Sequence, residues 1–174
     1  MTPEEFQSLY PQVIGWIHQT LAAHAKEAKA VASLGFRRLS RYFSEELLTS
    51  TKVVVINRVP MPALSSMGLS QFAEFERGDY EGITYLDTFF VKRRGAAVEW
   101  LHFHELIHVI QWRLLGPEAF LAVYAAGLET FGYRESWRLL AIAKARWRSW
   151  PTTLRRHFVS PTNSSTQRSW SRIN

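Results

Sequence analysis

Near the N-terminus, apolar residues recur with the period of an α-helix. They fall on one face over residues 13–28, and Thr2 to Glu5 form a capping box with proline at the first helical position. The pattern predicts a helix that begins at Pro3. We expect Pro11 to interrupt it, because proline lacks the amide hydrogen that an interior position donates. A second helical stretch is expected to continue to about Ser33.

Two later segments are rich in β-branched and aromatic residues, which favour strands. The first, Val53 to Ile56, suits a buried strand, and the second, Ile83 to Val91, is expected to form one longer strand. Residues 57–82 between them contain five prolines and glycines, so we expect an irregular connection there.

Helical periodicity returns in the second half of the chain. Gly116-Pro117 is typical of a point where one helix ends and another begins, so we expect helices over residues 96–115 and 117–131. A third helix is expected over residues 134–150, because Pro151 forbids its continuation.

These segments together indicate an α+β fold that is mainly helical and has a small sheet. The 174 residues, 47% of them hydrophobic, are enough for one domain with its own core. We expect a single domain over residues 1–158 and a disordered, basic, Ser/Thr-rich tail over residues 159–174. Residues 8–25 carry no formal charge but are too polar for lipid, and no secretory signal is evident, so we expect no membrane span and a cytoplasmic location.

The net charge of +6 is confined to the C-terminal part of the chain. Residues 1–100 hold eleven basic and eleven acidic side chains, so the whole excess lies in residues 101–174. Such a segment can contact phosphates or anionic lipid. No nucleic-acid-binding motif accompanies the charge, so a solvated helix face and tail are expected rather than a nucleic-acid partner.

The chemistry is concentrated in His104-Glu105-Leu106-Ile107-His108, within the expected helix of residues 96–115. Histidines four residues apart lie on one helical face, so both can bind one ion, whereas His102 points to the opposite side. Glu105 follows the first ligand directly and can accept a proton from an activated water. The chain has no cysteine, which excludes thiolate zinc sites and cysteine nucleophiles. The pattern predicts a Zn²⁺ hydrolase.

A carboxylate is the expected third ligand, because a third histidine at the metzincin spacing is missing. The downstream acids are Glu118, Glu129 and Glu135. Glu135 shares a side of its expected helix with Leu139 and Ile142, where an unpaired carboxylate would be costly. Glu129 has the usual sequence distance but points away from the buried face of its helix. We predict Glu135 as the ligand, with Glu129 as the alternative.

Two further roles are assigned by position in the chain. Tyr133 is expected to stabilise the oxyanion that forms during hydrolysis, with Tyr124 as the alternative, because both are near the presumed ligands in sequence. The strand of residues 83–91, which contains Tyr85 and Asp87, could pair with an extended peptide by strand addition.

Residues 82–141 resemble the small single-domain gluzincin-type metallopeptidases, the minigluzincins. The likeness covers about a third of the chain and rests on Gly-Ile-Thr-Tyr-Leu-Asp-Thr-Phe-Phe-Val, His-Glu-Leu-Ile-His-Val-Ile-Gln-Trp, Leu-Gly-Pro-Glu-Ala-Phe and Gly-Tyr-Arg. It implies a zincin-like domain with a strand that lines the cleft, a helix that carries the HExxH motif and a later helix that carries a glutamate ligand. A zinc metallopeptidase acting on a peptide or protein substrate is the implied function.

One departure from the family pattern leaves other functions open. The family's glutamate usually lies deeper in the last helix, where this chain has Trp137 to Ala141 without an acid. A protein that binds zinc but lacks catalytic activity is therefore one alternative. The other is a basic interaction module whose C-terminal arginines contact nucleic acid or an anionic membrane.

Overall fold

The computed structural model describes residues 2–131, and all structural statements concern that range. The fold is α+β, as predicted, with four helices, four strands and five short 3-10 turns in this range. The helices are α1 (Pro3–Ala23), α2 (Glu45–Ser50), α3 (Ala73–Arg77) and α4 (Glu99–Phe131), and the strands are β1 (Lys29–Ala30), β2 (Lys52–Ile56), β3 (Gly82–Tyr85) and β4 (Thr88–Lys92). The helix expected over residues 134–150 and the tail expected over residues 159–174 lie outside the described residues.

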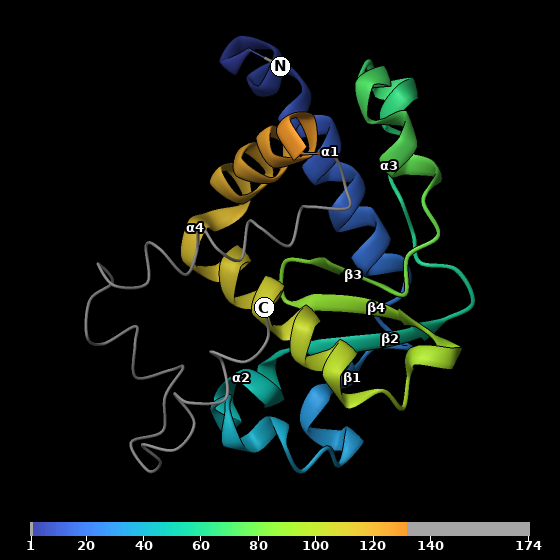
Figure 1. Ribbon diagram of the computed structural model, residues 1–174, viewed down its shortest axis with the longest axis vertical. Coiled ribbons are helices and arrows are strands. Elements are labelled where there is room, and N and C mark those ends of the chain that lie inside the picture. Colours follow the sequence, from blue (N-terminus) through green and yellow to red (C-terminus); the bar gives the residue numbers. More distant parts are fainter. Residues whose placement is uncertain (1, 132–174) are drawn as a thin grey trace.

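The four strands form one mixed sheet in the order β1-β2-β4-β3. Strands β2 and β4 are parallel, and each outer strand pairs antiparallel with its neighbour. Every residue of β4 is buried, whereas β3 is an edge strand beside α4. In Figure 1, α1, α3 and the end of α4 lie at one end of the molecule, and α2 lies at the other.

The expectation of one strand over residues 83–91 is wrong. The segment is a hairpin in which Tyr85 pairs with Thr88 and the chain reverses at Leu86 and Asp87. Leu86 has φ 57°, a left-handed conformation that glycine or asparagine usually supplies in such turns. Because a leucine occupies the turn, the sequence carries no turn signal there. Of the two hairpin strands, only β3 lies at an edge of the sheet.

Helix α1 follows its prediction at the start but not at the end. Its capping box is present, since Thr2 Oγ1 accepts from the amide of Glu5 at 3.2 Å and the Glu5 side chain accepts from the Thr2 amide at 2.7 Å. Pro11 does not interrupt the helix, which ends at Ala23 rather than near Ser33. Proline removes one backbone hydrogen bond, and packing of the apolar face, with Ile17 only 1% exposed, holds the helix together across it.

Helix α4 contains the predicted break. Gly116 has φ 75° and ψ 162°, so the first half of α4, residues 99–115, is separated by a kink from the second half, residues 117–131. The first half packs on β3 and β4, and the second half turns toward α1 and the η4 turn (Ser70–Phe72). No helix within residues 2–131 is long and apolar enough to cross a membrane.

Candidate metal centre

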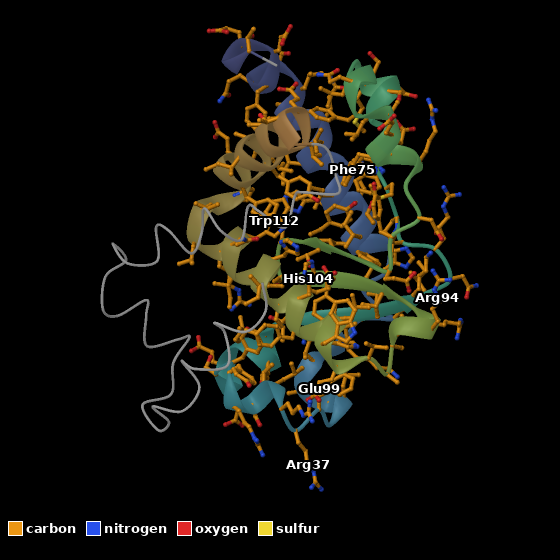
Figure 2. The ribbon with its side chains drawn as sticks, viewed as in Figure 1. Arg37, Phe75, Arg94, Glu99, His104 and Trp112 are labelled. Atoms are coloured by element: carbon orange, nitrogen blue, oxygen red, sulfur yellow. The ribbon has the colours of Figure 1, made fainter. Side chains whose placement is uncertain are left out.

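His104 and His108 direct the same ring atom toward each other. Their Nε2 atoms are 3.1 Å apart, and the rings meet edge to face with centroids 4.7 Å apart. Two nitrogens bound to one tetrahedral zinc ion at about 2.05 Å would lie about 3.3 Å apart. The pair could therefore hold one ion with little rearrangement. His104 lies where the first half of α4 passes over the sheet (Figure 2).

Gln111 fixes the orientation of His108. Its side-chain oxygen lies 2.8 Å from His108 Nδ1, and because an amide oxygen only accepts, Nδ1 carries the hydrogen. The lone pair of a neutral His108 is then on Nε2, which is the tautomer that a metal ion needs. We did not predict this role for Gln111, although its position three residues after His108 on the same helical face was a usable signal.

Both histidines are held in the neutral form. Burial, and to a smaller extent the nearby His104, lower the pKa of His108 to about 4, although the bond to Gln111 opposes these effects. Burial also lowers the pKa of His104. Metal ions bind neutral imidazole, so neither ring carries an extra proton that must be removed before binding near pH 7.

Glu105 is buried beside the histidine pair and is bonded to the edge strand. Its side chain is 3% exposed, and Oε2 accepts a hydrogen bond of 2.6 Å from Thr84 Oγ1. A Cβ atom at Gly82 would lie 2.5 Å from Oε1, so a larger residue there would force the carboxyl group to move. Burial raises the pKa of Glu105 to about 7, although the bond from Thr84 opposes the rise. A carboxyl group with this pKa can take up and release a proton near neutral pH.

A second bond joins β3 to α4. Trp112 Nε1 donates to the main-chain oxygen of Thr84 at 3.1 Å, one turn beyond His108. Gly82 and Thr84 alternate along β3, so both face the site-bearing helix. Sequence reasoning missed both residues, because their role depends on the contact between β3 and α4.

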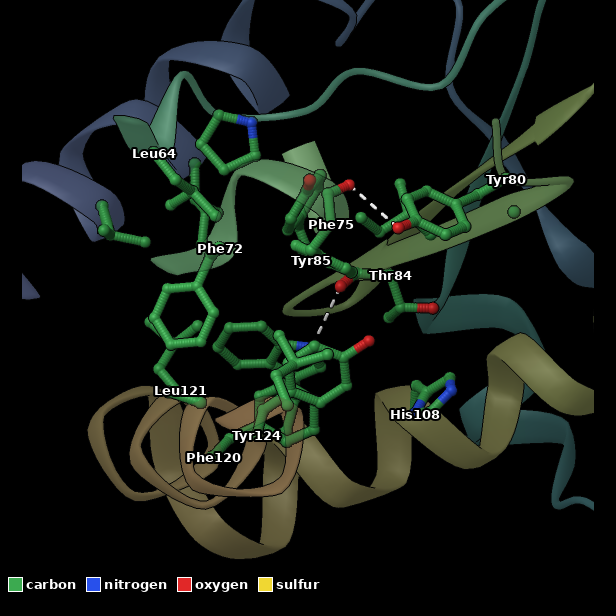
Figure 3. Close-up of a pocket in the computed structure, with 18 of the residues that line it drawn as sticks. Leu64, Phe72, Phe75, Tyr80, Thr84, Tyr85, His108, Phe120, Leu121 and Tyr124 are labelled. Atoms are coloured by element: carbon green, nitrogen blue, oxygen red, sulfur yellow. Dashed lines mark hydrogen bonds between the residues drawn. The ribbon is translucent and has the colours of Figure 1, made fainter. Parts of the chain in front are cut away.

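The three motif residues open into one cavity of about 710 Å³. His104, Glu105 and His108 line it together with β3, α1, the segment of residues 62–75 and the second half of α4. Figure 3 shows His108 and Thr84 at one end of this cavity. Tyr124, the alternative oxyanion donor, lines the same cavity from α4.

The hairpin changes what the strand of residues 83–91 can do. Residues of β3 line the cavity, whereas β4 lies inside the sheet. Tyr85 is buried and donates through its hydroxyl to the main-chain oxygen of Pro60 at 2.9 Å, and burial raises its pKa well above the ordinary value. Asp87 is exposed in the turn. Pairing with an extended peptide is therefore restricted to β3.

The structure brings only part of the predicted ligand set together. Within residues 2–131, no group of three His, Asp or Glu side chains is arranged to hold a metal ion. Glu129 is exposed near the end of α4. Glu135 and Tyr133 lie outside the described residues. His102 is fully buried, with Nε2 2.9 Å from the main-chain oxygen of Ala96, and takes no part in the site.

Comparison with known proteins finds no matching family model, no matching curated protein and no matching solved structure. The resemblance to gluzincin-type peptidases therefore stays a prediction from the motif. A function for this chain is inferred from the side chains that the site contains.

Proposed function

We propose that this protein is a zinc-dependent amide hydrolase of the metallopeptidase type. His104 and His108 are its histidine ligands, and Glu105 is its general base. The observation that carries the proposal is the 3.1 Å separation of the two Nε2 atoms, in rings that are neutral and next to a carboxyl group with a pKa of about 7. A packed helix without a ligand would gain nothing from burying these three polar groups together.

The proposal assigns the remaining roles first to Glu135 and Tyr133, which lie beyond the described range, and names an alternative for each within it. Catalytic zinc sites usually have three protein ligands and one open position. Glu135 is the proposed third ligand, and Glu129 is the alternative. Tyr133 is the proposed oxyanion donor, with Tyr124 as the alternative, which already lines the cavity.

Zinc bound at this pair supplies a Lewis acid that acidifies water and polarises a carbonyl group. Glu105, buried beside the histidine pair, accepts the proton of the attacking water. It then delivers that proton to the leaving amine. Thr84 holds Oε2 during both transfers, so the carboxyl group keeps one orientation.

A peptide substrate would lie along β3. This strand is at the edge of the sheet and borders the cavity, so an extended backbone can pair with it. The main-chain oxygen of Thr84 already accepts a hydrogen bond from Trp112. A substrate backbone would therefore pair with β3 at Gly82, which lies beside Glu105.

Metal analysis of the purified protein and its variants tests the proposal. Wild-type protein should retain zinc, His104→Ala should lose it, and Glu105→Gln should keep zinc but lose hydrolysis of a peptide library. His18→Ala is the matched control, because His18 is an exposed histidine on α1. Equal zinc content in His104→Ala and His18→Ala would contradict the metal site. Zinc binding without any hydrolysis by the wild type would favour the inactive alternative.

A further inference from the structure

The cavity that holds the motif residues has two chemically different ends. Polar side chains, including Glu105 and His108, gather at the end near β3. Leu64, Leu69 and Phe72 line the opposite end and are only 5–7% exposed. Figure 3 shows Leu64 and Phe72 across the cavity from Thr84 and His108. One continuous space therefore leads from the site into an apolar chamber.

Two helices form the long walls of this apolar chamber. Helix α1 contributes residues spaced by one turn, and the second half of α4 contributes a matching apolar face. The wall residues are Leu9, Val13 and Ile17 from α1 and Leu121, Ala125 and Leu128 from α4. Figure 1 shows α1 beside the second half of α4 at the same end of the molecule. Leu9 and Ile17 are eight residues apart, so this apolar wall runs about 12 Å along α1.

Three aromatic side chains of the cavity wall, Tyr80, Tyr85 and Trp112, already donate to main-chain oxygens. The Tyr80 hydroxyl donates to Phe75 at 2.9 Å, and the Tyr85 hydroxyl donates to Pro60 at 2.9 Å. Trp112 donates to Thr84, as described above. A peptide amide that entered the chamber would lose its water partners without a replacement from these groups, which costs free energy. An aliphatic chain has no such groups to desolvate.

Charged side chains lie at the polar end of the cavity, near β3. Asp79 and Glu81 line it next to Gly82, and they pair with Lys92 and Arg94 respectively. The Asp79 side chain is 71% exposed, so this end meets solvent. A ligand that fits the whole cavity is therefore an amphiphile, with a polar part at the mouth and an apolar chain inside.

We propose that the chamber binds a linear acyl chain and that the substrate of the site is an N-acyl amide. The amide bond lies at Glu105 and the amine part lies at the mouth. The identification of this N-acyl amide as a substrate, rather than only a ligand, rests on the proposed function. A volume of about 710 Å³ is within the usual range of small-molecule sites, which is about 300–1,000 Å³.

The reaction adds one water across the amide bond. The water oxygen bonds to the acyl carbon and the carbon–nitrogen bond breaks. Glu105 takes one water proton and passes it to the amine nitrogen. The products are an acyl carboxylic acid, which can remain in the chamber, and a free amine, which can leave at the mouth.

Binding without turnover tests the chamber. The full-length Glu105→Gln variant would be titrated calorimetrically with acetyl, hexanoyl and dodecanoyl derivatives of glycinamide. Burial of each methylene contributes about 0.8 kcal/mol, which is about fourfold in affinity, so the affinity should rise with chain length until the chamber is full. An affinity that does not depend on chain length would overturn the proposal.

A blocking variant locates the chain. Ala125→Trp, added to the same background, should weaken dodecanoyl binding at least about tenfold, because it fills the space that the methylenes need. Acetyl binding should not change. Ala126→Trp is the matched control, since Ala126 is exposed on the other side of the same helix. If Ala125→Trp does not fold by circular dichroism, Val13→Trp on the opposite wall replaces it.

The outcomes separate this inference from the proposed function. Unchanged dodecanoyl binding in a folded blocked variant overturns the acyl site, as does tighter binding of a leucine-rich peptide than of the dodecanoyl probe. If wild-type protein hydrolyses the acetyl probe, Glu105→Gln does not, and longer chains are not preferred, the proposed function is supported and the acyl site is contradicted. If long chains bind but no amide is hydrolysed, the acyl site stands and the hydrolase falls.

Discussion

Thr84 and Glu105 are joined by a hydrogen bond of 2.6 Å from the threonine hydroxyl to the carboxylate. The two residues belong to different elements, β3 and α4, so this bond aligns the edge strand with the helix that carries the histidine pair. It also opposes the effect of burial on the pKa of Glu105. The bond therefore links the shape of the site to the protonation of Glu105, the proposed general base.

Removal of this bond should change the pH profile of hydrolysis. Thr84→Val keeps the shape of the side chain but cannot donate, so the pKa of Glu105 should be higher in the variant than in the wild type. The acid limb of kcat/KM against pH should move to higher pH by about one unit or less. An acid limb that stays in place would mean that Glu105 is not the base.

Gly82→Ala should reduce activity without removing zinc. The added Cβ would lie 2.5 Å from Glu105 Oε1, so the carboxyl group must move. A displaced base should lower kcat by about tenfold or more, because proton transfer depends on placement. Gly15→Ala is the control, since a Cβ there meets nothing within 4 Å. Equal kcat in the two variants would contradict the role of Gly82.

Gln111→Ala should weaken zinc binding. The variant frees His108 Nδ1, so the ring is no longer held in the ligand tautomer. Loss of such a partner typically lowers metal affinity about 10- to 100-fold. Competition with a chromogenic chelator measures this change. Unaltered affinity would show that Gln111 does not orient His108.

The stability of the metal-free protein should depend on pH through Glu105. Its folded pKa is about 7 and its ordinary value is 4.5, so between these values the folded state binds more protons and the free energy of unfolding falls as pH rises. Glu105→Gln removes this dependence. Relative to wild type, the free energy of unfolding of the variant should increase by up to about 3 kcal/mol as the pH rises from 4 to 8, because the buried carboxyl group of the wild type becomes charged. Urea titrations with a chelator present measure this difference. A difference in free energy of unfolding between variant and wild type that stays constant from pH 4 to pH 8 would contradict the raised pKa of Glu105.

Thr51→Val should stabilise the protein. Thr51 is fully buried, and its hydroxyl has no hydrogen-bond partner among the described residues. Valine has nearly the same shape and buries no polar group, so the free energy of unfolding should increase by about 1 kcal/mol. Thermal denaturation measures this, and a lower Tm would indicate that the hydroxyl has a partner.

The pairing of the HExxH histidines and the helix break after the motif could be predicted, because both depend on local sequence. Histidines four residues apart share a helical face in any helix, and Gly116-Pro117 ends one helix and begins another through backbone chemistry alone. The pairing of His104 with His108 in space followed from that spacing.

Features that depend on packing could not be predicted from the sequence. Leu86 adopts a turn conformation that leucine rarely supplies, so the β3–β4 hairpin had no signal. Pro11 is tolerated because the apolar face of α1 packs on the core. Thr84 and Gly82 reach Glu105 only because β3 lies beside α4, and contacts between distant segments leave no local pattern.

X-ray absorption at the zinc edge of the purified full-length protein tests the central claim most directly. Zinc held by His104 and His108 should show a first shell of nitrogen and oxygen at about 2.0–2.1 Å, with the outer scattering of two imidazole rings. That outer scattering should be reduced in His108→Ala and unchanged in His18→Ala. A protein that retains no zinc, or zinc whose spectrum shows no imidazole, would contradict the metal centre.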